Sequence, residues 1–414
     1  MKLSPTSLDK NKIKILLLEG IDPGAAAAFR EDGYGEVEYH KKSLPEAELK
    51  EAIKDASFIG IRSNTHLTKK ILDSAQRLIG VGCFCIGTNQ VDLESARDRG
   101  IPVFNAPFSN TRSVAELVLA ETIMLMRGIP WRNMETHRGR WAKTAEGSHE
   151  VRGKTLGIVG YGHIGTQVGV LAESLGMRVV FYDIESKLAL GNATQLPTLR
   201  AMLEVSDVVT LHVPETPQTK NMIGSEQLGQ MKPRASLINA ARGTTVDIDA
   251  LDAALESGHL AAAAIDVFPK EPKSVGDEFV SPLRGRDNVI LTPHVGGSTV
   301  EAQKNIGREV AEKLIKYSNN GSTLFAVNFP EVSLPEHPGY HRLMHIHRNQ
   351  PGVLSCINTI FSEEKINIAA QYLQTNAAIG YVVMDIETPA REASLKLRQR
   401  LDQVAGTIRT RILY

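Results

Sequence analysis

Residues 155–183 read TLGIVGYGHIGTQVGVLAESLGMRVVFYD and carry the strongest fold signal in the chain. Their hydrophobic pattern predicts a strand, a helix and a second strand, at residues 156–159, 164–175 and 178–182. Between the first strand and the helix, residues 160–165 have the spacing GxGxxG, and Asp183 follows the second strand. A glycine-rich turn in this context is typical of a dinucleotide-binding unit.

Each glycine of this turn has a physical reason. Gly160 permits the tight turn, Gly162 lets the backbone approach a pyrophosphate, and Gly165 lets the helix pack closely on the strand. The free amides and the dipole at the start of the helix favour a bound anion. The cofactor contacts that we expect at this turn are Gly160, Gly162, His163, Ile164 and Gly165.

Asp183 indicates which dinucleotide the unit prefers. Its carboxylate can accept hydrogen bonds from both adenosine ribose hydroxyls and would repel the additional phosphate of NADP. The three residues after it include no arginine, although Lys187 is near. We therefore expect NAD as the cofactor. The alternative is that Asp183 only caps the turn after the strand.

Alternating strands and helices continue on both sides of this unit. The region from residue 12 to 105 and the region from residue 155 to 291 each predict a doubly wound parallel sheet. Between them, residues 113–127 predict a long helix, for which Ser113 and Glu116 form a candidate capping box. After residue 341 the predicted order is βαββαβ, the ferredoxin-like split unit. The predicted fold class is thus α/β, with two doubly wound sheets and a ferredoxin-like terminal module.

Composition excludes several classes of protein. The chain has 414 residues, which is enough for about three domains. Lys plus Arg and Asp plus Glu each number 47, so the basic excess typical of nucleic-acid binders is missing. The longest apolar stretch, residues 117–126, is interrupted by Glu121 and is far shorter than the ~20 residues that cross a bilayer. We expect a cytoplasmic protein that binds neither membranes nor nucleic acid, and its amino terminus does not resemble a signal peptide.

The three cysteines, Cys83, Cys85 and Cys356, form neither a CxxC pair nor an even disulfide framework. This usage agrees with a reducing compartment. Cys83 and Cys85 lack a second pair of metal ligands, so we expect core residues and no metal site.

Three polar residues follow strands of the second predicted sheet. Arg242, Glu271 and His294 each come where a strand should end, at the edge at which open α/β sheets bind ligands. Histidine titrates in the range useful for taking a hydroxyl proton, and a carboxylate on its other ring nitrogen would fix its tautomer. An arginine can bind an α-carboxylate through two hydrogen bonds. The three residues predict a catalytic site for a 2-hydroxy acid.

At these positions the sequence resembles the D-isomer-specific 2-hydroxyacid dehydrogenases. The similar segments are residues 156–183, 231–247 and 266–272. The resemblance assigns catalysis to Arg242, Glu271 and His294. It also implies further NAD contacts at Ala240, Ala241, Arg242, Asp266, His294, Val295, Gly296 and Gly297.

The same resemblance implies the domain organisation. A discontinuous, flavodoxin-like substrate-binding domain comprises residues 1–110 and 298–328, and the Rossmann NAD-binding domain, residues 111–297, is inserted into it. A proline-containing linker, residues 329–340, leads to a terminal module, residues 341–414, that resembles an ACT domain.

Four further segments carry a narrower resemblance: residues 61–63, 82–92, 104–116 and 292–297. They are similar to the family members that oxidise 3-phosphoglycerate to 3-phosphohydroxypyruvate, the first step of serine synthesis, and that also reduce 2-oxoglutarate. The resemblance places Arg62, Asn110, Ser113 and Lys143 at the substrate. Lys143, together with Arg132 near Trp141, is a candidate to reach a neighbouring subunit, and each of these cations is alternatively a solvated surface charge. The resemblance also implies a homotetramer.

In serine-regulated relatives, residues of the ACT domain bind the effector between two subunits. Here His347, Asn349 and Asn367 match those positions, which implies feedback inhibition by L-serine. Arg348 departs from the acidic residue expected there, and this charge puts the affinity for the effector in doubt. The alternative is that His347 is a surface residue at the end of a strand.

Two other functions stay open at this point. The pocket is alternatively selective for 2-oxoglutarate, hydroxypyruvate or another 2-oxo acid. In the third interpretation, the chain is a dinucleotide-sensing binding protein like the corepressors that share the dehydrogenase fold, although its balanced charge and ACT-like module argue against this.

Overall fold

The structure, a computed structural model, describes residues 9–272, 276–387 and 391–413, with the side chains of residues 391–394 excepted. The chain divides into two compact units. The first contains Met1–Ser109 and Gln303–Tyr414, and the second contains Asn110–Ala302. No helix among the described residues is long and apolar enough to cross a bilayer.

The first unit contains a five-stranded parallel sheet in the order β2-β1-β3-β4-β5, which is the flavodoxin-like order 2-1-3-4-5. Its strands are β1 (Ile15–Leu17), β2 (Val37–Tyr39), β3 (Phe58–Ile61), β4 (Gly80–Cys83) and β5 (Val103–Asn105). Its helices are η1 (Lys10–Lys12), α1 (Pro23–Glu31), α2 (Glu46–Ala52), α3 (Lys69–Leu72), α4 (Leu93–Arg97) and α11 (Val300–Asn320), which begins at the boundary with the second unit.

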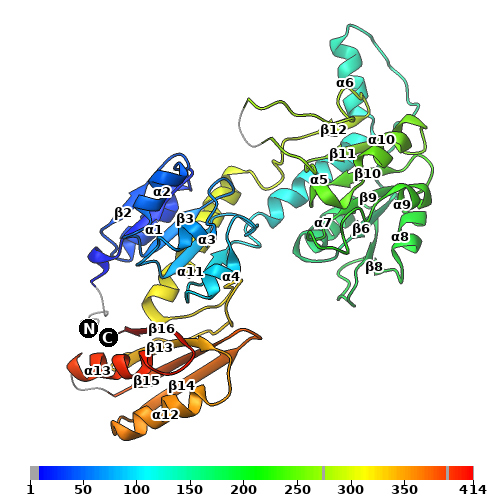
Figure 1. Cartoon of the computed structure of the whole chain (residues 1–414). Coiled ribbons are helices and arrows are strands. Elements are labelled where there is room, and N and C mark those ends of the chain that lie inside the picture. Colours follow the sequence, from blue (N-terminus) through cyan, green and yellow to red (C-terminus); the bar gives the residue numbers. More distant parts are fainter. Residues whose placement is uncertain (1–8, 273–275, 388–390, 414) are drawn as a thin grey trace. The chain divides into compact units, whose positions relative to one another are not determined.

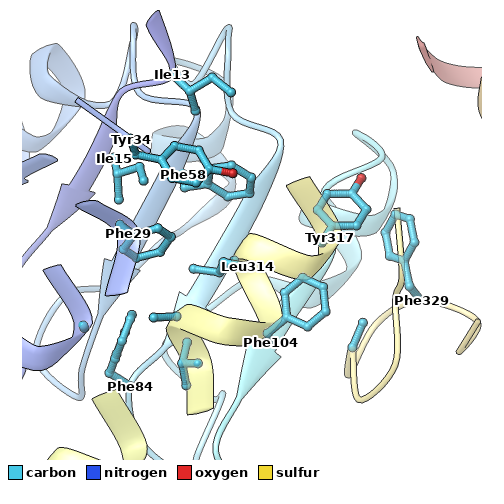
Figure 2. Packing of buried hydrophobic residues seen from close by; sticks show 14 of the residues in the cluster. Ile13, Ile15, Phe29, Tyr34, Phe58, Phe84, Phe104, Leu314, Tyr317 and Phe329 are labelled. Atoms are coloured by element: carbon cyan, nitrogen blue, oxygen red, sulfur yellow. The ribbon is translucent and has the colours of Figure 1, made fainter. Parts of the chain in front are cut away.

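Helix α11 returns late in the sequence to cover one face of this sheet. A Cβ on Gly80 would lie 3.5 Å from Leu314, and one on Gly82 would lie 2.7 Å from Val310, so these glycines of β4 let the helix approach closely. Leu314 and Tyr317 project toward the strands that carry Phe58 and Phe104 (Figure 2). The core of this face is therefore built from segments about 200 residues apart in the chain.

The second unit contains a seven-stranded parallel sheet in the order β12-β11-β10-β9-β6-β7-β8. Read from its other edge, this is the Rossmann order 3-2-1-4-5-6 with a seventh strand added. The strands are β6 (Thr155–Val159), β7 (Arg178–Tyr182), β8 (Thr194–Gln195), β9 (Val208–Leu211), β10 (Ser236–Asn239), β11 (Ala262–Ile265) and β12 (Val289–Leu291).

Helices cover both faces of the second sheet (Figure 1). One face packs against α5 (Thr111–Met126) and α7 (His163–Ser174), and the other against α8 (Leu199–Val205), α9 (Ser225–Gln230) and α10 (Ile248–Glu256). The remaining elements are α6 (Ile129–His137) and η2 (Gly243–Thr245).

The capping box expected at Ser113 is wrong. Helix α5 begins earlier, with Asn110 at its N-cap, because the Asn110 carbonyl accepts the Val114 amide at 3.1 Å. Ser113 therefore lies inside the first turn, where its hydroxyl is 2.8 Å from that of Thr299. Glu116 pairs with Arg112 instead.

The terminal module has the predicted order βαββαβ and forms an antiparallel sheet in the order β14-β15-β13-β16. Its elements are β13 (His341–Arg348), α12 (Val353–Glu363), β14 (Ile368–Thr375), β15 (Ile379–Ile386), α13 (Arg391–Asp402) and β16 (Thr407–Leu413). Helices α12 and α13 cover one face of the sheet.

The other face of this sheet joins the hydrophobic core of the first unit. Met344 and Tyr381 belong to the same buried cluster as α11. Arg342 is fully buried, binds both carboxylate oxygens of Asp385 at 2.6 and 2.7 Å, and donates to the carbonyls of Asn320 and Pro335. The segment 329–340 has no helix or strand, but Phe329, Val332 and Leu334 within it are buried.

Candidate active site

The glycine-rich turn between β6 and α7 has the stereochemistry that only glycine satisfies. Gly160 has φ of +89°, and a Cβ on it would lie 2.5 Å from the His212 carbonyl oxygen. A Cβ on Gly165 would collide with the carbonyl of Gly160. A Cβ on Gly162 would meet nothing within 4 Å, and no side chain caps α7 there. The start of α7 is therefore open to an anion, as a dinucleotide pyrophosphate requires.

Asp183 stands at the end of β7 and accepts the Tyr161 amide at 2.9 Å and the Glu185 amide at 3.0 Å. It does cap the turn, but a carboxylate oxygen accepts more than one hydrogen bond, so both oxygens keep capacity for ribose hydroxyls. Lys187 forms an ion pair with Glu185. That pairing leaves Asp183 as a negative charge beside the turn, which fits NAD.

A short segment after β10 shapes the turn that carries Arg242. The fully buried Asn239 donates to the Arg242 carbonyl at 3.0 Å and accepts the Ala241 amide at 3.1 Å. A Cβ on Gly243 would collide with the backbone of Phe268. This close approach brings the turn after β10 next to the segment that leads to Glu271.

Glu271 and His294 form a hydrogen-bonded pair. Nδ1 of His294 lies 3.0 Å from Oε2 and 3.1 Å from Oε1 of Glu271, and the Phe268 amide donates to Oε1 at 3.2 Å. The positive charge of Arg242 acts on both residues. All three predicted residues are thus brought together, and Nε2 of His294 has no hydrogen-bond partner among the described residues.

The pair shifts the pKa of each partner. The hydrogen bond to Glu271 raises the pKa of His294 against the opposing effect of burial. Partial burial raises the pKa of Glu271, but the hydrogen bond and charge of His294 outweigh it, so the pKa of that carboxyl is lowered. Glu271 is therefore an anion that orients the imidazole and stabilises its protonated form.

Asp266 holds the backbone that carries His294. His294 has φ of +55°, a left-handed conformation that is uncommon for a residue with a side chain. Its amide donates to the Asp266 carbonyl at 2.8 Å, and the Asp266 carboxylate accepts the Thr292 hydroxyl and the Val295 and Gly296 amides at 2.6 to 2.8 Å. These bonds fix the turn. Sequence reasoning predicts Asp266 only as a cofactor contact and misses this role.

The predicted substrate residues Asn110 and Ser113 lie in the second unit, at the start of α5. Asn110 is 8% exposed, its Oδ1 has no hydrogen-bond partner among the described residues, and a Cβ on Gly297 would collide with its Nδ2. The structure thus brings Asn110 beside Gly297. Ser113, one turn further on, is bound to Thr299.

Arg62 lies in the first unit, directly after β3, and a buried glutamate shapes its loop. Glu19 is 8% exposed and accepts the amides of Arg62, Asn64 and Thr65 at 2.8 to 3.0 Å. The side chain of Gln90 donates to the Arg62 carbonyl at 2.8 Å. Sequence reasoning missed the roles of Glu19 and Gln90, because each acts through a contact with a residue far away in the chain.

Lys143 lies in an exposed segment after α6, near Trp141, which is 83% exposed. Within the described residues, the Lys143 ammonium makes no hydrogen bond or ion pair. Arg132 instead donates to the carbonyls of Ala142 and Glu146 and orders this segment. The structure does not bring Lys143 to Arg242, Glu271 or His294.

The predicted effector residues lie at the end of β13 and the start of β14. His347 is 4% exposed, which contradicts the surface alternative, and its Nε2 is buried without a partner among the described residues. Gly380 leaves room for its ring on the neighbouring strand. Asn349 binds the Asn376 carbonyl at 2.8 Å, and Asn367 is exposed. The Arg348 guanidinium lies 3.9 Å from the Asp98 carboxylate.

Cys83 is fully buried in β4, and burial raises the pKa of its thiol. Over the described part of the chain, no group of three or more His, Cys, Asp or Glu side chains is placed to hold a metal ion. Cys83 is therefore a core residue.

Comparison with known proteins agrees with this geometry. Residues 119–296 match the NAD-binding domain of the D-isomer-specific 2-hydroxyacid dehydrogenases, and residues 343–409 match the AHAS small subunit-like ACT domain. NAD is accordingly the cofactor of an oxidoreductase, and the terminal module is an ACT domain.

Relatives named D-3-phosphoglycerate dehydrogenase cover the whole chain. The protein from Escherichia coli K12 is 62% identical over 412 residues and 100% of both chains, and that from Haemophilus influenzae is 63% identical over 99% of both. A solved structure, the TT0316 protein from Thermus thermophilus, covers 73% of this chain and 96% of its own, with 32% identity and a TM-score of 0.66. The chain therefore belongs to the D-isomer-specific 2-hydroxyacid dehydrogenase family and, within it, to the D-3-phosphoglycerate dehydrogenases.

Proposed function

We propose that the chain oxidises 3-phospho-D-glycerate to 3-phosphohydroxypyruvate with NAD, the first step of L-serine biosynthesis, under feedback inhibition by L-serine. The observation that carries the catalytic part is the pair of His294 and Glu271 at 3.0 Å, under the charge of Arg242. A proton acceptor, an anion that orients it and a cation for the substrate carboxylate are what oxidation of a 2-hydroxy acid needs.

Each residue has one role in the proposed mechanism. Arg242 binds the α-carboxylate and polarises the oxygen on C2. Nε2 of His294 takes the hydroxyl proton while the C2–H bond breaks and the C2–O double bond forms. Glu271 stabilises the imidazolium that results. NAD, when bound, accepts the hydride from C2.

Residues of the glycine-rich turn, together with Asp183, hold the cofactor in this proposal. Residues 160–165 would hold the pyrophosphate, and Asp183 would bind the adenosine ribose. The remaining contacts come from residues 240–242, Asp266 and residues 294–297. The openness of the turn at Gly162 supports this assignment.

For the substrate, we assign the phosphate to Arg62, with Asn110 and Ser113 beside the carbon chain. The position of Arg62 supports this, because Glu19 and Gln90 hold its backbone amide and carbonyl. The guanidinium group takes no part in these bonds and is therefore available for a phosphate. Lys143 is assigned to the active site of a neighbouring subunit in a homotetramer. Residues 1–110 with 298–328 form the substrate domain, residues 111–297 the NAD domain, residues 329–340 the linker and residues 341–414 the ACT domain.

The serine site consists of His347 and Asn349, with Asn367 contributed across an interface by a second copy of the chain. Nε2 of His347 is buried without a partner among the described residues, and this supports the role, since a buried ring nitrogen without a partner costs free energy unless a ligand binds it. The proposed compartment is the cytoplasm, where substrate and cofactor are supplied.

The test follows NAD reduction with 3-phosphoglycerate at alkaline pH and, in reverse, oxidation of NADH with phosphohydroxypyruvate, each with and without L-serine. Activity suppressed by serine supports both parts of the proposal. Activity that L-serine does not change contradicts the proposed effector site. If neither reaction occurs but the protein turns over 2-oxoglutarate or hydroxypyruvate, that 2-oxo acid takes the place of phosphohydroxypyruvate as the substrate.

A further inference from the structure

Glu121 places a carboxyl group on the apolar side of α5. The residue is 2% exposed, and neither carboxyl oxygen has a hydrogen-bond partner among the described residues. Its neighbours on the helix, Val118 and Leu125, are buried. Burial, and then the charge of Asp266, raise the pKa of Glu121 to about 8. At neutral pH the carboxyl is therefore uncharged and carries an O–H donor.

The same side of α5 runs along the turn that carries His294. A Cβ on Gly296 would lie 3.7 Å from Val114 and 3.6 Å from Leu117 of the helix, and 2.9 Å from Oδ2 of Asp266. Glu121 follows Leu117 by four residues, so it lies on this side one turn further along. Helix α5 and Asp266 thus converge on Gly296, and Glu121, one turn further along the helix, is near enough for the charge of Asp266 to act on it.

The Asp266 carboxylate holds the loop that carries His294, so its own position decides the position of this loop. Its carboxylate accepts three hydrogen bonds from the loop between Thr292 and Gly296, and these keep His294 in its left-handed conformation. Oδ2 accepts only the Gly296 amide among these bonds, which leaves capacity for a further donor. A second ionised carboxylate behind Asp266 would be repelled, whereas an uncharged one can donate.

We propose that Glu121 is a positioning residue whose carboxylic acid donates its O–H to the Asp266 carboxylate and thereby holds the turn that carries His294. The link from Glu121 to catalysis rests on the proposed role of His294. The proposed hydrogen bond from Glu121 to Asp266 does not rest on it, so the bond and its effect on catalysis can be tested separately.

The first test measures amide hydrogen exchange at Val295 and Gly296, whose amides donate to Asp266. The variants are Glu121→Gln, which keeps a donor, and Glu121→Leu and Glu121→Met, which do not. Glu116→Gln is the matched control on the exposed side of the same helix. We expect the Leu and Met variants to exchange these amides about tenfold faster or more, and the Gln variant and the control to stay within about threefold of the parent protein. Unchanged exchange in either apolar variant overturns the proposal.

The second test compares kcat with the unfolding temperature. An apolar residue at this position should change the unfolding temperature little, because loss of the proposed hydrogen bond is offset by removal of a buried polar group. We nevertheless expect Glu121→Leu to lower kcat by about tenfold or more, and Glu121→Gln to keep kcat close to that of the parent protein. A purely structural role would move the unfolding temperature without kcat and would contradict the proposal. The exchange experiment needs no substrate, so failure of the parent protein to oxidise 3-phosphoglycerate would count against the proposed function alone.

Discussion

His294 and Glu271 shift each other's pKa in opposite directions across a contact of 3.0 Å. The contact joins the segment after β11 to the segment after β12, which lie at the same edge of a parallel sheet. Because the pKa of the imidazole is raised and that of the carboxyl lowered, each partner stabilises the charged form of the other. In the proposed mechanism, Glu271 therefore stabilises the imidazolium that forms when the neutral His294 takes the substrate proton.

Glu271→Gln should change the pH dependence of oxidation. The neutral imidazole is the base, and its raised pKa delays its appearance as pH increases. Without the carboxylate the pKa of His294 falls, so the acid limb of kcat/KM moves to lower pH, while kcat drops by roughly 10²–10⁴-fold. The pH–rate profile from pH 5 to 10 measures both. Glu278→Gln, at an exposed ion pair with Arg284, is the control, and an acid limb that moved upward would contradict the assignment.

Gly165→Ala should disrupt cofactor binding, because its Cβ collides with the Gly160 carbonyl. We expect the affinity for NADH to fall about tenfold or more, which is at least about 1.4 kcal/mol. Gly169→Ala, one turn later in α7, is the matched control, since its Cβ would meet Tyr161 and Val179 at ordinary contact distances of 3.4 Å. Fluorescence titration with NADH gives both values. Equal affinities in the two variants would mean that the turn does not hold the cofactor.

Glu121→Gln should alter how stability depends on pH. The folded pKa of about 8 lies above the ordinary value of 4.5, so the folded state binds the proton more tightly. The parent protein therefore loses stability relative to the variant as pH rises from 4.5 to about 8, at up to about 1.4 kcal/mol per pH unit, and the difference is constant above that range. Denaturant unfolding of both proteins between pH 5 and 9 measures the slope. A difference that did not vary with pH would show that Glu121 is ionised in the folded protein.

Asp385→Leu should destabilise the first unit strongly, because it leaves the fully buried Arg342 without its carboxylate. We expect a loss of about 3–5 kcal/mol in the free energy of unfolding. The double variant Arg342→Met with Asp385→Leu should recover a large part of this loss, since no uncompensated charge remains. Arg308→Met, at an exposed pair with Glu312, should cost less than about 1 kcal/mol. A single variant as stable as the double one would contradict the role of this pair.

Much of the second unit is predictable from the sequence, since local signals decide it. Strand β7 has the predicted bounds, and α7 differs from the prediction by one residue at each end, because glycines and a hydrophobic run mark this region. Strands β2 and β8 and helix α6 carry weaker signals. Both strands are short and lie at sheet edges, without fully buried residues, and α6 has a single buried residue, Glu135.

The residues of the candidate site likewise differ in how well the sequence predicts them. Arg242, Glu271 and His294 follow strands, so their convergence follows from the rule that parallel strands end at one edge. The residues that hold them are less visible. Asp266 looks like the end of a strand, Glu19 like a surface charge, and Glu121 like an interruption of an apolar run. The roles of Asp266 and Glu19 arise from hydrogen bonds to loops 26 to 46 residues away, and the proposed role of Glu121 from a bond to the distant Asp266, so no local pattern encodes them.

The late position of α11 has a consequence for biosynthesis. The second unit is one continuous stretch, Asn110–Ala302, whose ends are tied by the bond between Ser113 and Thr299. The first sheet, in contrast, leaves the ribosome without the helix that packs on Gly80 and Gly82. At about 5–20 residues per second, this helix follows roughly 10–50 seconds later. The inserted unit can therefore fold before the first sheet has the helix that completes its core. Until then, the apolar strands β1 and β3 are the segments that a nascent-chain chaperone would need to cover.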